Sequence, residues 1–353
     1  MGIARAIPAM AIIMTVRNRI ISFLAVLTAS SSTAFAVDGS TAYNFLNITA
    51  SSRIYGLGGV NITLVDDDIN STDQNPALLG PEVEKQLGLN YMRYVGESNF
   101  AGIRYGMAAG EHGAWAAGIQ YFGYGDMKAT DVSGNITGTF SAKDVAFSAT
   151  YSHDITGNLR GGITVKGIYS SYESYSAFAL GTDLGINYYD PDRGVSLSAV
   201  VANLGGQIKR FNERYDRLPV DVRLGLSKQL ADVPLRLSVT AWNLTKWHLP
   251  YYDAGDGSAT ATEMEKKDSF GSNLFRHLVF GVEWLPSDRF YAGVGYNYKT
   301  RTDMGTYSRS FLSGFSACAG INVRQFSVGI SLAQPHTGAT TFMLNLSTRL
   351  WEF

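Results

Sequence analysis

The sequence is poor in charge and in cysteine, and it lacks a long apolar run beyond its N-terminus. Only 17% of its 353 residues are charged, against about 25% in typical soluble domains. The lone cysteine, Cys318, excludes a disulfide scaffold, and the net charge of −1 gives no support for nucleic-acid binding. After residue 36, no run approaches the roughly 18 apolar residues of a transmembrane helix. Glycine (38), tyrosine (20) and phenylalanine (18) are abundant instead, which excludes a disordered chain.

A secretory signal peptide is predicted at residues 1–36. Arginines precede the apolar run 20–27, and the segment ends in Ala-Phe-Ala36. Basic residues, a short apolar core and an A-x-A exit are the parts of such a peptide, and the run is too short to cross a bilayer. A chain that starts at Met14 still contains a complete, compact signal peptide, so the true start is either Met1 or Met14. We expect cleavage after Ala36 and export from the cytoplasm.

Beyond the signal, apolar residues recur at every second position, which is the period of a β-strand. In residues 325–332, Phe326, Val328, Ile330 and Leu332 share one face, and small or polar residues share the other. Residues 180–189, 218–227 and 290–299 repeat the pattern. Nothing from Lys85 to the end is predicted to be helical.

Two architectures give this alternation. In a soluble sandwich the apolar face packs on a second sheet, whereas in an outer-membrane barrel it faces lipid and the small, polar face lines the lumen. Fourteen strands are predicted, an even number that favours the barrel. They are 85–94, 98–108, 113–125, 140–154, 158–171, 177–189, 194–205, 218–229, 234–247, 277–285, 289–300, 314–323, 325–333 and 340–353.

The connections between these strands favour the barrel independently. Such barrels alternate short periplasmic turns with longer external loops. The even-numbered connections are all tight, whereas four of the odd ones are long and polar: 126–139, 206–217, 248–276 and 301–313. The chain is therefore predicted to be an all-β transmembrane antiparallel barrel over residues 85–353. The closing aromatic Phe353 is out of phase with the apolar face of the last strand, so we expect either a bulge near Arg349 or aromatics in the barrel mouth.

Residues 37–84 do not follow the strand pattern, and by length they form either a plug in the lumen or a periplasmic segment. Gly58 and Gly59 are predicted to form a tight backbone turn. Asp66, Asp67 and Asp68 form either a solvated turn or a calcium site, with the turn favoured. Asn75 and Pro76 belong to the same predicted plug motif.

Several segments carry a resemblance to a known family. They are Tyr43-Asn-Phe-Leu-Asn47, Ala50-Ser-Ser-Arg53, Leu57-Gly-Gly59, Asp66-Asp-Asp68, Asn75-Pro-Ala-Leu-Leu79, Phe122-Gly-Tyr-Gly125, Leu218-Pro-Val-Asp-Val-Arg-Leu-Gly-Leu-Ser-Lys228 and Arg276-His-Leu-Val-Phe-Gly-Val-Glu283. The chain resembles the PorQ family of type IX secretion-system outer-membrane proteins. This family is related to the PorV-type proteins and to the fatty-acid-transporter-like barrels.

The resemblance implies a non-catalytic, fourteen-stranded barrel in the outer membrane of a Gram-negative bacterium. Its partners would be a PorZ-like surface protein together with sortase-like and PorV-like components. This attachment complex links secreted cargo to anionic lipopolysaccharide. The alternatives are a fatty-acid-transporter-like channel for hydrophobic solutes, a PorV-like cargo shuttle and a soluble secreted sandwich. A polar or blocked lumen would count against the channel.

No chemistry-bearing motif is present, so neither an enzyme nor a cofactor is predicted. The sequence has no H-E-x-x-H, G-x-S-x-G or P-loop, and its five histidines are scattered. The candidate partner-binding residues lie in two long loops instead, where arginine pairs with acidic groups or phosphate. They are Lys209, Arg210, Phe211, Arg214, Tyr215 and Arg217 in the first loop, and Trp247, Tyr251 and Tyr252 in the second. For the first loop, an alternative of equal weight to partner binding is a solvated loop that anchors to anionic lipid headgroups.

The signal-peptide prediction can be checked on protein purified from outer membranes. N-terminal sequencing should return Val37 as the first residue, because signal peptidase cleaves after the A-x-A motif. A mature chain that retains Ile20–Leu27 would show that this segment is an anchor or a buried helix.

Overall fold

The computed structural model describes residues 43–131, 133, 135–212, 215–253, 265–303, 312–336 and 339–350. The predicted signal peptide with Ala36, the loop residue Arg214 and the terminal Phe353 lie outside these ranges. None of the helices in the described ranges is long and apolar enough to cross a membrane.

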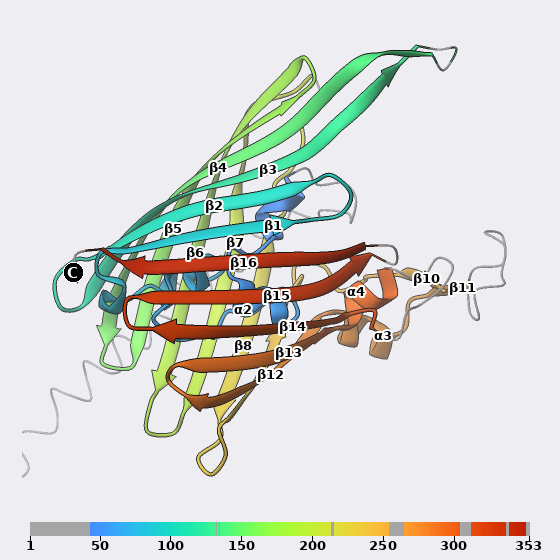
Figure 1. The fold of residues 1–353 in the computed structure, drawn as a ribbon. Helices are drawn as coiled ribbons and strands as arrows, with labels where there is room; N and C mark the ends of the chain where they lie inside the picture. The colour runs from blue at the N-terminus through green and yellow to red at the C-terminus, as the bar shows by residue number, and fades with distance from the viewer. Residues whose placement is uncertain are drawn as a thin grey trace, which may run out of the picture. The chain divides into compact units, whose positions relative to one another are not determined.

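Fourteen antiparallel strands close into a barrel, in which the first strand pairs with the last (Figure 1). They are β1 (Gln86–Arg93), β2 (Asn99–Ala108), β3 (Gly113–Thr130), β4 (Ile136–Thr156), β5 (Leu159–Tyr172), β6 (Tyr175–Asp190), β7 (Val195–Lys209), β8 (Asp221–Gln229), β9 (Leu235–Ala241), β12 (Leu278–Ser287), β13 (Phe290–Asn297), β14 (Phe315–Val323), β15 (Phe326–His336) and β16 (Ala339–Arg349). The short strands β10 (Tyr251–Asp253) and β11 (Glu265–Lys267) form a separate two-stranded sheet. The sequence therefore predicted both the fold class and the strand number correctly.

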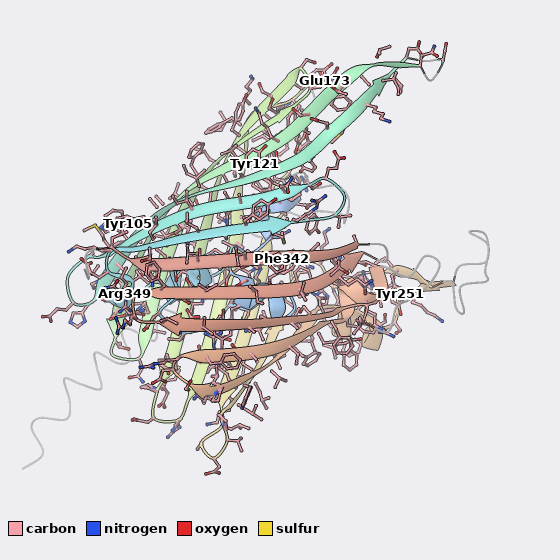
Figure 2. The ribbon with its side chains drawn as sticks, in the orientation of Figure 1. Tyr105, Tyr121, Glu173, Tyr251, Phe342 and Arg349 are labelled. Carbon is pink, nitrogen blue, oxygen red and sulfur yellow. The ribbon has the colours of Figure 1, made fainter. Side chains whose placement is uncertain are left out.

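The polarity of the barrel is the reverse of that of a soluble protein. Its outward side chains are apolar and exposed, among them Tyr121 on β3 and Phe342 on β16 (Figure 2). The inward side chains are buried and mostly small or polar, as in Thr150, Ser198 and Asn345. The described barrel strands form one closed sheet, and its outward apolar side chains are exposed rather than packed on another sheet, so the soluble sandwich is excluded.

The two ends of the barrel differ in the length of their connections. At one end the strands are joined by tight turns, such as those at residues 157–158 and 324–325. In barrels of this type the short turns are periplasmic and the longer loops external. Arg349, at the end of β16, and Tyr251, in a long loop, lie at these opposite ends (Figure 2). We call them the periplasmic and external ends.

Several strand boundaries differ from the predictions. The predicted loop 126–139 is a hairpin extension of β3 and β4. No other described strand pairs with it, because β2 pairs with β3 only as far as Gly123 and β5 with β4 only from Ala142. Leu218 is not a lipid-facing strand residue but is buried in a cluster at the external side of the lumen. Pairing of β16 with β1 stays regular to Arg349, so the proposed bulge near that residue is absent from the described part of the strand.

Two short helices interrupt a region that was predicted to contain none. They are α3 (Phe270–Arg276) and α4 (Tyr298–Asp303). Each begins where a side chain accepts a hydrogen bond from a helix N–H: Ser269 Oγ from Ser272, and Asn297 Oδ1 from Thr300. The alternation signal missed both, because they are shorter than the windows over which helical periodicity is visible.

Residues 43–84 lie inside the barrel as a plug (Figure 1). The plug contains the helical turns η1 (Asn44–Asn47), α2 (Ser52–Gly56), η2 (Ile69–Thr72), η3 (Pro76–Leu78) and η4 (Pro81–Val83). It starts near the external end, where Gln207 of β7 donates a 2.6 Å hydrogen bond to the Tyr43 hydroxyl. It ends at the periplasmic rim, where Val83 packs with Ala114 and Ala116 of β3. The plug thus runs through the whole lumen.

Glycines in the wall leave room for this plug. A Cβ atom on Gly162 of β5 would lie 2.4 Å from the backbone carbon of Pro76, and one on Gly185 of β6 would lie 2.2 Å from Asn75 Oδ1. Both distances are too short for any side chain. The Asn75-Pro76 turn therefore packs directly on strand backbone.

This close packing predicts that Gly162→Ala destabilises the protein. The added methyl group overlaps plug backbone, which must shift, and overpacking of this kind costs about 1–3 kcal/mol. Thermal unfolding in detergent, followed by loss of the compact band on unheated gels, would measure the effect. Gly138→Ala is the matched control, because a Cβ at that β4 position meets nothing within 4 Å. Equal stability of the two variants would contradict the packing.

Candidate functional site

The plug is fastened to the wall by an ion cluster around Glu283. This β12 carboxylate is 2.6 Å from Arg53 Nε of the plug and 2.7 Å from Arg236 Nε of β9. The guanidinium of Arg53 also lies 4.2 Å from the centre of the Tyr291 ring. All three charged groups are largely buried. Buried charges persist only when they are paired, so this cluster holds the middle of the plug against two strands.

The aspartate-rich segment of the plug adjoins the same cluster. Asp66 Oδ2 is 3.3 Å from Arg53 Nη1 and accepts a hydrogen bond from the Ser71 hydroxyl at 3.0 Å. Asp68 caps η2 by accepting from the backbone N–H of Asn70. Asp67 points to solvent, 3.6 Å from Arg349. The three aspartates therefore form a structured turn with different partners.

Burial raises the pKa of both Asp66 and Asp68. Desolvation of the charged form is the largest cause, and for Asp66 it outweighs the opposing attraction to Arg53. These carboxyl groups therefore hold a proton more readily than exposed aspartates do. Within the described ranges no cluster of three or more His, Cys, Asp or Glu residues could hold a metal ion.

A second set of polar contacts holds the plug nearer the external end. Asn47 Oδ1 accepts a 3.2 Å hydrogen bond from Arg223 of β8, which is itself 2.7 Å from Asp221. On the adjacent wall, Lys166 of β5 is 2.6 Å from Asp183 of β6. The plug is therefore tied to β8 through Asn47, beside a second ion pair within the wall.

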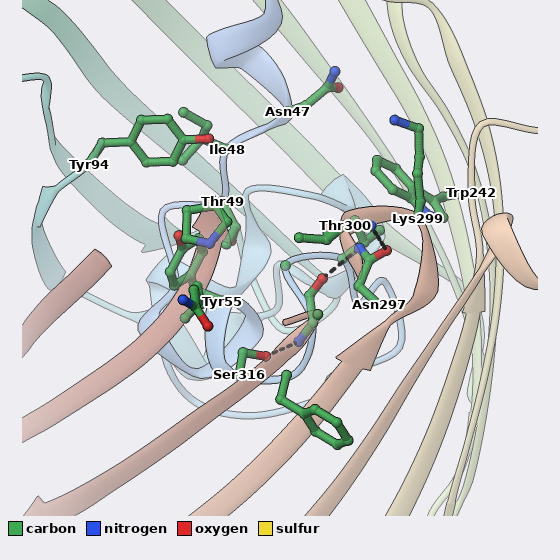
Figure 3. Close-up of a pocket in the computed structure, with 18 of the residues that line it drawn as sticks. Asn47, Ile48, Thr49, Tyr55, Tyr94, Trp242, Asn297, Lys299, Thr300 and Ser316 are labelled. Atoms are coloured by element: carbon green, nitrogen blue, oxygen red, sulfur yellow. Dashed lines mark hydrogen bonds between the residues drawn. The ribbon is translucent and has the colours of Figure 1, made fainter. Parts of the chain in front are cut away.

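The backbone of the Gly58-Gly59 turn is held by wall side chains (Figure 3). Both glycines have left-handed backbone conformations, with φ values of 99° and 86°. Ser316 Oγ accepts from the Gly58 N–H at 2.9 Å, and Asn297 Nδ2 donates to the Gly58 carbonyl at 3.1 Å. A Cβ on Gly58 would lie 2.3 Å from Val279. The predicted tight turn is present, and it binds the plug to β13 and β14.

A cavity of about 390 Å³ lies between the plug and the external part of the wall (Figure 3). Amide, hydroxyl and ammonium side chains alternate with aromatic rings around it. They include Asn47, Thr49, Tyr55, Tyr94, Trp242, Asn297, Lys299, Thr300 and Ser316. A smaller cavity of about 190 Å³ lies at the periplasmic side and shares no lining residue with the first. Residues of α2 separate them.

The first predicted docking loop is only partly available at the surface. Phe211 stacks on Tyr172 with ring centres 4.8 Å apart and also packs near Tyr43, so its ring belongs to the interior cluster. Arg210 lies over the Tyr215 ring at 5.5 Å, and both are exposed. Lys209 Nζ donates to Ser176 at 2.7 Å, and Arg217 is exposed.

The described residues of the second predicted docking loop make aromatic contacts. The Trp247 ring stacks against His277 at 5.3 Å, and the Tyr251 ring lies 5.0 Å from the guanidinium carbon of Arg276. For Tyr252 only the backbone, in β10, is described.

The sequence reasoning missed Arg236 and Glu283, which are central to the plug contacts. Both occupy inward positions of strands whose other inward residues are small, such as Gly281 and Ser238. A charged residue in such a position is a recognisable signal, because it must find a partner in the lumen.

The described residues define a plugged outer-membrane-type β-barrel, and solved structures share the barrel fold. The toluene transporter TodX of Pseudomonas putida matches with a TM-score of 0.51 and 12% identity, over 85% of this chain and 97% of its own. A deltaS2S3 mutant of TodX, a monoaromatic hydrocarbon channel, matches with a TM-score of 0.53 and 12% identity, over 86% of this chain and 100% of its own. A FadL homologue of Pseudomonas aeruginosa matches at 0.49, with 12% identity over 85% of this chain and 98% of its own. No family model and no curated protein matches in sequence.

The fold is therefore that of outer-membrane β-barrels. The two TodX structures are those of channels or transporters rather than of enzymes. At 12% identity the similarity concerns the fold alone, and what each of them transports does not carry over to this chain.

The ion cluster predicts a large effect for Glu283→Gln. The neutral amide leaves Arg236 buried without its paired carboxylate and Arg53 with Asp66 alone, and breaking a buried pair in this way costs about 3–5 kcal/mol. Thermal unfolding in detergent and the rate of proteolysis within residues 43–84 would measure the loss of plug anchoring. Asp67→Asn is the matched control, because it removes an exposed plug carboxylate. Similar behaviour of the two variants would show that the cluster does not hold the plug.

Proposed function

We propose that the protein is a non-catalytic scaffold of the type IX protein secretion system. In this role it anchors a PorZ-like surface partner in the attachment complex that links cargo to anionic lipopolysaccharide. The resemblance of its plug and strand segments to the PorQ family motivates the role. The observation that supports it best is the polar lumen occupied by the plug, because such a lumen offers little apolar surface to a hydrophobic solute.

The plug occupies this lumen from end to end. It extends from Tyr43 near the external end to Val83 at the periplasmic rim, and polar contacts fasten it to β7, β8 and β12–β14 along the way. The two cavities on either side of α2 have no lining residue in common.

A channel for hydrophobic solutes is the second candidate, and the solved structures favour it. TodX is described as a toluene transporter and as a monoaromatic hydrocarbon channel, and it shares the barrel fold. The polarity of the inward wall residues argues against a channel for hydrophobic solutes. Inward residues such as Thr164, Asn187 and Arg223 are polar and buried, whereas hydrophobic ligands bind in pockets lined mainly by apolar groups.

Co-purification distinguishes the two candidates. Affinity-tagged protein, solubilised from native outer membranes with mild detergent, should retain a PorZ-like surface protein together with sortase-like and PorV-like components. The double variant Arg210→Glu/Arg217→Glu should retain less of the surface protein if this basic loop forms part of the dock. An unrelated tagged barrel from the same membranes is the control.

Two further outcomes would decide against the scaffold. Repeated absence of these components would overturn the scaffold. Uptake of labelled toluene or a fatty acid into vesicles that contain the purified barrel, above the level of empty vesicles, would establish the channel instead.

A further inference from the structure

The short helix α3 has its polar and apolar sides reversed. Asn273 and Arg276 face the protein and are each 1% exposed, whereas Phe270 is 70%, Phe275 52% and Leu274 37% exposed. A helix on the surface of a water-soluble protein shows the opposite arrangement, with its apolar stripe toward the core. The exposed side of α3 is therefore suited to an apolar environment.

Polar contacts fix this orientation. Asn273 Oδ1 accepts a 3.0 Å hydrogen bond from the Leu249 N–H, and its Nδ2 donates to Asp268 at 2.8 Å. Arg276 is 2.6 Å from Asp303 of α4 and also donates to Thr302. Rotation of α3 to bury its phenylalanines would break all of these contacts, so the exposed apolar side is built into the fold.

Trp247 extends the apolar side of α3. Its ring centre lies 5.2 Å from that of Phe270, and the side chain is itself exposed. Trp247, Phe270, Leu274 and Phe275 together form what we call the aromatic patch. A cluster of exposed, large apolar side chains marks a surface that contacts lipid or another protein.

The barrel wall below the aromatic patch is short. β9 has seven residues, fewer than any other barrel strand. A tilted strand needs roughly 9–11 residues to cross the apolar part of a membrane. β9 pairs with β12 up to Ala241 and Leu278, and Trp242 continues this pairing by donating to the His277 carbonyl at 2.9 Å. α3 ends at Arg276, directly before β12, so the patch lies where the wall stops.

The patch also continues the lipid-facing surface. The outward residues of β12 include Val282 and Trp284, both exposed, and the chain leads from α3 straight into this strand. Aromatic residues form girdles at both membrane interfaces of such barrels, and short helices with Trp, Phe and Leu on one side lie in the interface. Continuity with the lipid-facing wall favours lipid over a protein partner.

We propose that α3 and Trp247 form an interfacial anchor that inserts into the outer leaflet of the outer membrane. The anchor completes the lipid-facing band where β9 is too short to reach across it. The acyl chains of the outer-leaflet lipid are the occupant of the patch. The anchor is independent of which function the barrel serves.

The test measures contact with acyl chains directly. Phe270→Cys and Leu274→Cys, each labelled with a polarity-sensitive fluorophore, are reconstituted into phosphatidylcholine vesicles with or without brominated acyl chains. The native Cys318 is buried and does not compete for the label. Ser133→Cys, in the turn of the β3–β4 hairpin, is the matched control. We expect a blue-shifted emission and several-fold stronger quenching by bromine at positions 270 and 274 than at 133.

Emission and quenching equal to those of the control would overturn the anchor. The same holds if the patch becomes shielded only when another outer-membrane protein is added, because the occupant would then be a protein. A second measurement does not depend on labelling. Phe270→Asn/Phe275→Asn should lower the unfolding temperature more in vesicles than Ile136→Asn does, since Ile136 is exposed on the hairpin; equal shifts would also contradict the anchor.

Discussion

Closure of the hydrogen-bonded sheet is the constraint on which the rest of the structure depends. Within a bilayer no water is available to pair with backbone N–H and C=O groups, so every strand edge must find a neighbour. The pairing of β1 with β16 removes the last open edges of the fourteen-stranded sheet. Closure also creates two surfaces with opposite requirements, an outer one that must be apolar and an inner one that is sheltered from lipid. The alternation at period two meets both requirements along each strand.

The inner surface imposes a second requirement, because polar groups withdrawn from water must be paired. The plug supplies partners for many of these polar groups. Its Arg53 shares Glu283 with Arg236, its Asn47 meets Arg223, and its Gly58 turn is held by Ser316 and Asn297. A lumen filled in this way has a polar core. The shared barrel fold does not by itself decide the function, since one fold serves several functions.

The external end shows where the barrel departs from a simple cylinder. β3 and β4 extend past their neighbours as a hairpin, whereas β9 stops early and is followed by the aromatic patch. Phe211 turns back onto the plug, and α3 presents its phenylalanines outward while Arg276 is held inside. These departures give the external end regions of different chemistry.

The sequence by itself determined the barrel, its fourteen strands and the sorting of short and long connections by end. These features follow from alternation and turn chemistry, which act between residues close together in the chain. The tertiary structure alone decided that Leu218 turns inward, that two short helices cap β12 and β13, and that Arg53 meets Glu283 across 230 positions. Local periodicity places a residue on the inner or outer face of a strand. It does not say which inward side chains face one another, because that depends on the register and closure of the whole sheet.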